Sequence, residues 1–413
     1  MDCRATPAPT AFPPRVRAHA QRAAFAAGIL TLAACGGTTT PEWCVAAEGA
    51  RLRVAHEPAG WSTPPELQTA WRMDGSVTGH ELMTPTSVAI SDVTDRIAMT
   101  DFGLREVAVI SLDGEWLGRW GSSGEGPGEL RAPFATGWRR DGQLVVYDPA
   151  GSKLVVFDSS GATLDDVPVD PAFTAALDGG ARSIRLDGSG LLLAHPGASF
   201  SGDGPARMHV IIRGGMSGTA LDTVLRSEAP VIIVEGAAPM TAPGWPVPLG
   251  AMHGDSILAL TGNSPDYRIS VYRNDSLSHV ICRDVQPMPF TDEEVQPVVE
   301  GVPERVRDAM ANAERPDRPA PIGRLMIDNE RRLWVQRDRP RALVGLDFVI
   351  GREGALLDVY DPEGVFLGEV RLPDNVRFLG ATEDLLIGLE TGDMDELSVV
   401  AFEFDIGDWK SDR

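Results

Sequence analysis

Residues 130–161, LRAPFATGWRRDGQLVVYDPAGSKLVVFDSSG, contain three short runs rich in apolar and β-branched residues, separated by Gly, Asp and Pro. Residues 82–114, LMTPTSVAISDVTDRIAMTDFGLREVAVISLDG, repeat the arrangement. The Leu and Pro that open the two stretches are 48 residues apart, and the Asp that closes the second run and the final Gly are 47 residues apart. Short strands divided by turn residues at a fixed period predict a repeated antiparallel β unit.

The unit recurs more loosely along the rest of the chain. Its third run ends in turn at Ser111, Asp158, Arg213, Arg273, Asp361 and Asp405. Runs that suit the second strand lie just before four of these, at LLLAH before Pro196, 256–262, 332–338 and 385–390. The fold class is therefore predicted as all-β, a six-bladed β-propeller over residues 67–413. Because a propeller closes by sharing one blade between its termini, we expect 67–73 to pair with the last blade near 398–405.

One interval between third strands, from Arg273 to Asp361, is 88 residues long and holds an insertion. Thr291 and Glu294 form a capping-box pattern, with Thr able to cap a helix and Glu able to reach back. We expect a small helical insertion at about 291–313, between blades four and five. The insertion could cover a ligand site as a lid, or it could have no role in binding, and the sequence leaves both alternatives open.

Residues 118–161 resemble an NHL repeat. The features are Gly124, Gly126 and Gly128 in a turn, Pro133, Asp148 closing the second strand, and Ser160-Gly161, where Ser replaces the usual Asp or Asn. From about Leu67 the chain resembles the six-bladed propeller lipoproteins of bacteria that are related to NHL-repeat proteins. The resemblance implies that the aspartates closing second strands fix turns by binding backbone amides.

The N-terminus has the pattern of a secretory signal. Four arginines precede the apolar run 23–34, which is too short to span a bilayer and ends in Leu32-Ala33-Ala34-Cys35. This end resembles the bacterial lipobox, which implies cleavage after residue 34 and lipid attachment at Cys35. We therefore expect a signal peptide at 1–34, a lipidated tether at 35–66 and anchoring to the membrane. An ordinary signal peptide with a chance cysteine is the alternative.

The expected export and the net charge limit where the protein can act and what it can bind. The sequence places the protein in the bacterial cell envelope, and Gly36 rather than Asp after the cysteine favours the outer membrane. A net charge of -22 argues against binding nucleic acid, which needs a basic face. Cys44 and Cys282 remain in the mature chain; secretion permits a disulfide between them, and two separate thiols are the alternative.

Few residues suggest a catalytic or metal-binding site. Gly254-Asp255-Ser256 imitates a hydrolase nucleophile block, but it suits a turn before a strand better. Six-bladed propellers resembling lactonases hold channel calcium through Glu, Asn and Asp, so Asp101 and Asp148 could be considered as ligands. His195, His253 and His279 lie near strand ends without the spacing of a zinc site. Trp116, Trp120, Trp138 and Trp334 fall at positions that suit packing between blades.

The sequence thus predicts a lipid-anchored envelope propeller that binds or scaffolds a protein, peptide or glycan. Cys35 is the single site residue assigned, as the lipid attachment point; no catalytic or metal residue is assigned, and neither catalysis nor a cofactor is expected. The alternative is a calcium-dependent propeller hydrolase or lyase resembling lactonases.

Overall fold

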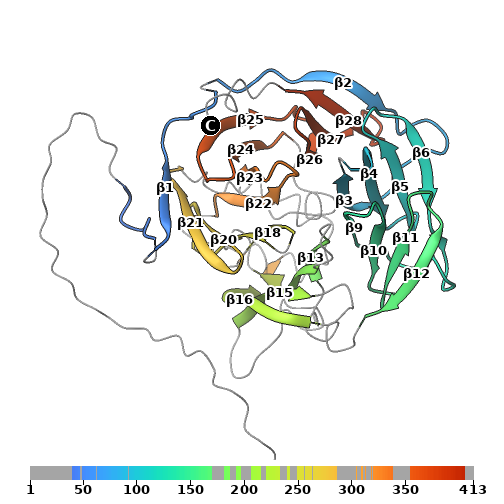
Figure 1. Cartoon of the computed structure of the whole chain (residues 1–413), viewed down its shortest axis with the longest axis horizontal. Helices are drawn as coiled ribbons and strands as arrows, with labels where there is room; N and C mark the ends of the chain where they lie inside the picture. The colour runs from blue at the N-terminus through green and yellow to red at the C-terminus, as the bar shows by residue number, and fades with distance from the viewer. Residues whose placement is uncertain are drawn as a thin grey trace, which may run out of the picture. The chain divides into compact units, whose positions relative to one another are not determined.

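The computed structural model describes residues 40–46, 49–61, 63–91, 93–169, 181–186, 192–196, 206–214, 220–232, 240–241, 249–254, 256–262, 264–285, 304, 308–309, 312, 318, 320–337 and 354–404. Their strands belong to the unit Thr40–Arg413. The described strands form six sheets of four or five strands and one of two. Within this unit the larger sheets surround a central axis (Figure 1), and the predicted all-β propeller is confirmed. The blade count of the whole chain stays a prediction.

Blades 1 and 2 are the two regular repeats. Their second and third strands are apolar on both sides, because a neighbouring blade packs against each side. The strands of blade 1 are β3 (Pro85–Ser91), β4 (Arg96–Asp101), β5 (Glu106–Ser111) and β6 (Trp116–Trp120). Those of blade 2 are β9 (Ala135–Trp138), β10 (Leu144–Asp148), β11 (Lys153–Phe157) and β12 (Thr163–Pro168). A two-stranded sheet, β7 (Ser122–Ser123) with β8 (Glu129–Leu130), lies in the connection between these blades.

Blades 3 and 4 each have five strands. Blade 3 consists of β13 (Ala181–Leu186), β14 (Leu192–Pro196), β15 (Ala206–Gly214), β16 (Ala220–Ile232) and β17 (Met240–Thr241). Blade 4 consists of β18 (Gly250–His253), β19 (Ile257–Thr261), β20 (Arg268–Arg273) and β21 (Ser276–Arg283), with β1 (Arg51–Ala55) as an outermost fifth strand.

Blades 5 and 6 return to four strands. Blade 5 consists of β22 (Ile322–Ile327), β23 (Leu333–Arg337), β24 (Leu356–Tyr360) and β25 (Phe366–Arg371). Blade 6 consists of β26 (Val376–Ala381), β27 (Leu385–Thr391) and β28 (Leu397–Glu403), with β2 (Gln68–Met73) outermost. The described third strands β5, β11, β15, β20, β24 and β28 are the six runs that the sequence predicted.

The ring closes as predicted. β2 pairs antiparallel with β28, from Gln68 opposite Glu403 to Met73 opposite Val399. Blade 6 therefore draws its outermost strand from the N-terminal side of the chain and its other strands from the C-terminal side. Neighbouring blades are joined near the axis: Thr86 in β3 donates a hydrogen bond to the Pro133 carbonyl oxygen just before β9, at 2.9 Å.

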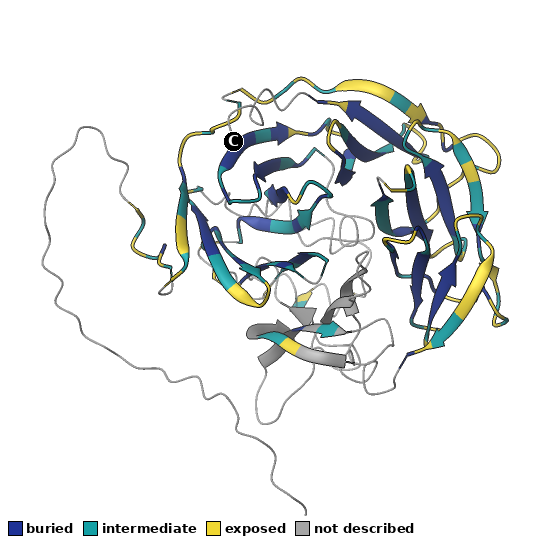
Figure 2. Ribbon diagram, viewed as in Figure 1, coloured by how far each residue is buried: buried dark blue, intermediate teal, exposed yellow. Residues whose placement is uncertain are grey.

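The core lies between blades. Trp120, Trp138 and Phe157 pack between blades 1 and 2, and Trp334 packs against Phe378 between blades 5 and 6. Three of the four tryptophans assigned to packing are buried, and Trp116 packs partly buried against the core of blades 1 and 6. Exposed positions concentrate on the outer strands β2 and β12 (Figure 2).

The segment before β2 differs from the predicted tether. β1 pairs in parallel with β21, and Cys44 forms a disulfide with Cys282 in that same strand. Further on, the amides of Gly60 and Trp61 donate to the Leu367 carbonyl oxygen in β25. Residues 40–46, 49–61 and 63–73, named the N-terminal belt below, thus line the outer edges of blades 4, 5 and 6 in turn. Of the segment 35–66 that was expected to be a lipidated N-terminus and tether, residues 40–46 and 49–61 contact blades 4 and 5, because RLRVA adds to an open sheet edge.

Candidate functional site

The two ends of the ring carry different connections. At one end, connections of two to five residues join neighbouring described strands within blades, for example 274–275 between β20 and β21. The long connections 169–180, 197–205, 233–239, 284–321 and 338–355 all join strand ends at the opposite end, where the innermost strands begin. We name this end the long-loop face. Long connections on a rigid scaffold are where binding residues usually lie.

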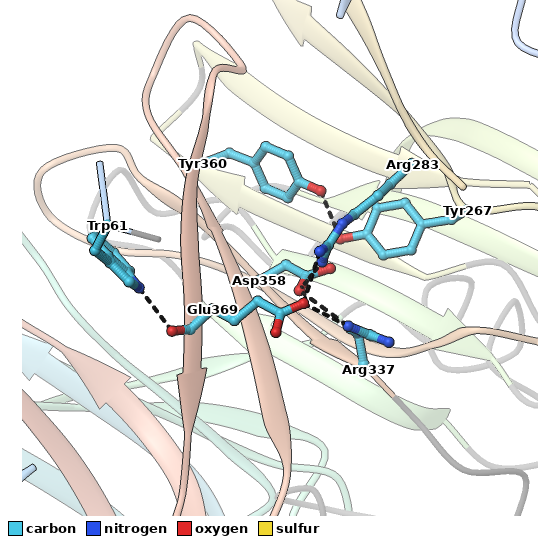
Figure 3. Close-up of polar contacts among 7 residues, drawn as sticks. All are labelled: Trp61, Tyr267, Arg283, Arg337, Asp358, Tyr360 and Glu369. Atoms are coloured by element: carbon cyan, nitrogen blue, oxygen red, sulfur yellow. Dashed lines mark hydrogen bonds and ion pairs between the residues drawn. The ribbon is translucent and has the colours of Figure 1, made fainter. Parts of the chain in front are cut away.

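A charged network marks the long-loop face at the seam between blades 4 and 5 (Figure 3). Arg283, the last residue of β21, forms an ion pair with Asp358 in β24 and donates to Glu369 in β25 at 2.7 Å. Arg337, the last residue of β23, donates to the same Glu369 oxygen at 2.8 Å. Arg283 thus joins blade 4 to both carboxylates of blade 5, while Arg337 holds Glu369 within blade 5.

Two buried tyrosines adjoin this network. The Tyr360 hydroxyl donates to the Tyr267 hydroxyl at 3.0 Å, and Tyr267 lies close to the Asp358 carboxylate. Burial raises the pKa of both tyrosines well above 10, and the charge of Asp358 adds to this effect. Both hydroxyls therefore stay protonated and serve as neutral hydrogen-bonding groups.

The charges of the network stabilise one another. Burial raises the pKa of Asp358 above 3.8, while the positive charge of Arg283 opposes this rise. Burial works to lower the pKa of Arg283, but the Asp358 carboxylate outweighs it and the pKa is raised. The buried Asp358 carboxylate pairs with Arg283 through one oxygen, so Asp358 acts as a structural anchor for Arg283.

Two arginines at the seam have side-chain nitrogens without an acceptor among the described residues. Arg337 uses one terminal nitrogen on Glu369, and within the described part of the chain its other nitrogens have no acceptor. Arg371 is exposed and makes no hydrogen bond or ion pair with any described residue. Both arginines flank Leu356 in register, so their Cα atoms are about 10 Å apart on one side of the sheet. Two guanidinium groups at this spacing can bind a carboxylate or phosphate between them.

Asp101 and Asp148 do not fit a calcium site. The Asp101 carboxylate accepts hydrogen bonds of 2.7–3.0 Å from the backbone amides of Met83, Thr84, Gly103 and Leu104. Asp148 likewise accepts from Arg131, Ala132 and Gly151 at 2.8–3.1 Å. Their oxygens hold turns together, as the NHL resemblance implied. Among the described residues, no group of three His, Cys, Asp or Glu side chains is placed to hold a metal ion.

The other candidate residues occupy structural positions. Gly254 and Ser256 lie in the hairpin that opens β19, with Gly254 at φ +61, so the hydrolase-like block is a turn. His253 ends β18, and His195 lies in β14. His279 is buried within β21 beneath β1. The three histidines lie on three different strands, with His195 in blade 3 and the other two in blade 4.

Two predictions fall outside the described residues. Cys35 and the signal peptide 1–34 are among them. So is most of the insertion 291–313, although Glu304, Asp308 and Ala309 are helical. No helix in the described part of the chain is long and apolar enough to cross a membrane.

Sequence reasoning missed the charged network. A signal was present, because Asp358 and Glu369 interrupt the apolar runs ALLDVY and VFLGEV of the same blade. An acid within a strand predicted as buried requires a cationic partner. Arg283 comes from another blade, 75 residues before Asp358, so the partner could not be named from local pattern.

No protein-family model and no curated protein matches the sequence. Solved structures similar to this chain include a protein described as exported from Bacteroides fragilis, with a TM-score of 0.48 and 10% identity, covering 85% of this chain and 98% of the other. A gluconolactonase of Xanthomonas campestris gives a TM-score of 0.38 and 12% identity, covering 84% and 99%. A streptogramin B lyase gives 0.40 and 9%, covering 81% and 97%. These neighbours are propeller-like, and the fold assignment rests on the sheet topology described above.

Proposed function

We propose that this protein is a lipid-anchored binding module of the bacterial cell envelope that holds a protein, peptide or glycan on its long-loop face. Its lipid is attached at Cys35, and the lipobox-like end of an exported signal peptide supports this address. The turn-fixing role of Asp101 and Asp148 supports kinship with NHL-repeat propellers. Gly36 after the cysteine favours the outer membrane.

The observation that carries the proposal is the arrangement of Arg337, which Glu369 holds through one terminal nitrogen, beside Arg371, which has no polar partner among the described residues. Arg337 is held in place by Glu369, while its remaining nitrogens and the whole of Arg371 lack partners among the described residues. A positioned arginine loses little side-chain entropy when it binds an anion. The ligand is therefore a molecule with an acidic group, such as a glutamate side chain, a chain terminus or a uronate.

Binding arrays test this proposal. One array holds peptides in paired Glu and Gln forms, and another holds oligogalacturonate beside oligogalactose. We expect the purified protein to retain acidic members preferentially, and the variant Arg337→Gln/Arg371→Gln to lose that preference. Arg131→Gln/Arg140→Gln removes the same charge from exposed positions of blade 2 and should keep the preference.

The single variant Arg371→Gln guards against misfolding, because Arg371 contacts no other described polar group. It should melt like the parent and bind acidic members less tightly. Equal retention of acidic and neutral members by the parent, or an unchanged preference in the double variant, would contradict the proposal.

A further inference from the structure

The N-terminal belt fixes the point at which a lipid anchor joins the propeller. The first described residue, Thr40, is five residues after Cys35, and Cys44 is disulfide-bonded to Cys282 of blade 4. The backbone amide of Cys44 also donates to the Pro41 carbonyl oxygen at 2.9 Å, so the chain forms a turn beside blade 4. Parallel pairing of β1 with β21 continues the attachment to Ala55.

The reach of the remaining chain is short compared with the propeller. Five residues span at most about 17 Å when fully extended. A domain of this length is about 50 Å across. The lipid on Cys35 therefore stays near the outer edge of blade 4 and cannot reach the outer edge of blade 1 on the other side of the ring.

The blade 4 edge also presents apolar side chains to solvent. Val45 is 61% exposed and Leu52 is 37% exposed, and both belong to the segment that attaches to blade 4. Arg51 beside Leu52 is exposed as well. Apolar and arginine side chains together suit the boundary between lipid headgroups and acyl chains.

We propose that the outer edge of blade 4, formed by residues 40–46 and 49–55, rests on the bilayer that holds the Cys35 lipid. This proposal rests on the lipid anchor of the proposed function. The axis of the ring then lies parallel to the membrane plane, and both the long-loop face and the hairpin end stay open to the surroundings. Blade 1, with its outermost strand β6, points away from the membrane (Figure 1).

Photo-crosslinking to lipid tests this orientation. Lipidated full-length protein is reconstituted into vesicles of phosphatidylethanolamine and phosphatidylglycerol, with benzoylphenylalanine placed at Leu52 or, as a matched control, at Leu117. Leu117 lies on β6 of blade 1 and is 40% exposed, which is close to the exposure of Leu52. We expect at least fivefold more lipid adduct from position 52 than from position 117.

The outcomes separate the two proposals. Vesicle-bound, lipidated protein with equal adducts from both positions, or more from position 117, would overturn the orientation and leave the anchor standing. A Cys35→Ser variant that keeps the lipid label and its vesicle association would overturn the anchor, and the orientation with it.

Discussion

Asp101 shows how a single carboxylate can determine a turn. Four backbone amides donate to it, and its side chain is completely buried. Replacing Asp101 with Ala would leave these donors without their acceptor, so we expect a loss of about 2–4 kcal/mol in the free energy of unfolding. Urea denaturation measures this loss, and Asp113→Ala, at an exposed hairpin position, should change stability by less than about 0.5 kcal/mol.

The same variant separates a turn from a metal site. Calcium should not raise the melting temperature of the parent through Asp101, since its oxygens are already used. A calcium-dependent rise in the parent that disappears in Asp101→Ala would contradict the structural role and favour the lactonase-like alternative.

His279 makes stability depend on pH. Burial lowers its pKa from 6.5 to about 4, and the nearby charges of Arg273, Arg53 and Arg51 contribute. Below pH 6.5 the unfolded chain binds a proton at this position that the folded chain refuses until about pH 4. The free energy of unfolding should therefore fall as the pH drops through this window, by about 2 kcal/mol from this residue.

Urea midpoints at pH 7 and pH 4.5 test the contribution of His279. The parent should lose more stability on acidification than His279→Gln, whereas His56→Gln, at an exposed position, should behave like the parent. Identical acid losses in the parent and His279→Gln would show that the buried imidazole does not resist protonation.

At the scale of strands, β1 and β2 should contribute differently to folding. A chain starting at residue 56 lacks β1 and the disulfide but keeps β2 in blade 6. A chain starting at residue 74 lacks β2 too and leaves the edge of β28 unpaired beside an apolar face. We expect the first to stay folded with lower stability and the second to aggregate.

Size-exclusion chromatography and thermal melting compare the two truncated chains. The first variant serves as the control for loss of the N-terminal segment in general. A chain starting at residue 74 that elutes as a monomer and melts like the chain starting at residue 56 would mean that β2 is dispensable for closure.

The strands that repeat at blade spacing could be predicted from sequence, because their apolar runs and turn residues are local signals. The third strand of every described blade and the pairing of β2 with β28 were anticipated. β1 was missed because RLRVA has too little pattern to indicate a strand, and its pairing with β21 joins residues 228 positions apart. The proximity of Arg337 and Arg371 could not be predicted, because it depends on the register of β24, which places Leu356 between them.

At the scale of the whole molecule, the seam is less acidic than the protein as a whole. The net charge is -22, whereas at the seam Arg283, Arg337 and Arg371 balance Asp284, Asp358 and Glu369. Long-range repulsion from the acidic surface weakens with salt, while contacts at the seam are short. An acidic ligand should therefore depend on the guanidinium groups of Arg337 and Arg371 for both affinity and position.

The most direct test of this account is the affinity of one peptide in its Glu and Gln forms, measured by calorimetry on the parent and on Arg337→Gln/Arg371→Gln. The peptide is the tightest binder found on the array. The account predicts that the parent binds the Glu form about tenfold or more tightly than the Gln form, since charge-assisted hydrogen bonds contribute about 1.5–3 kcal/mol, and that the double variant binds both forms alike. Equal affinity of the parent for the two forms, or a preference that survives in the double variant, would contradict the central claim.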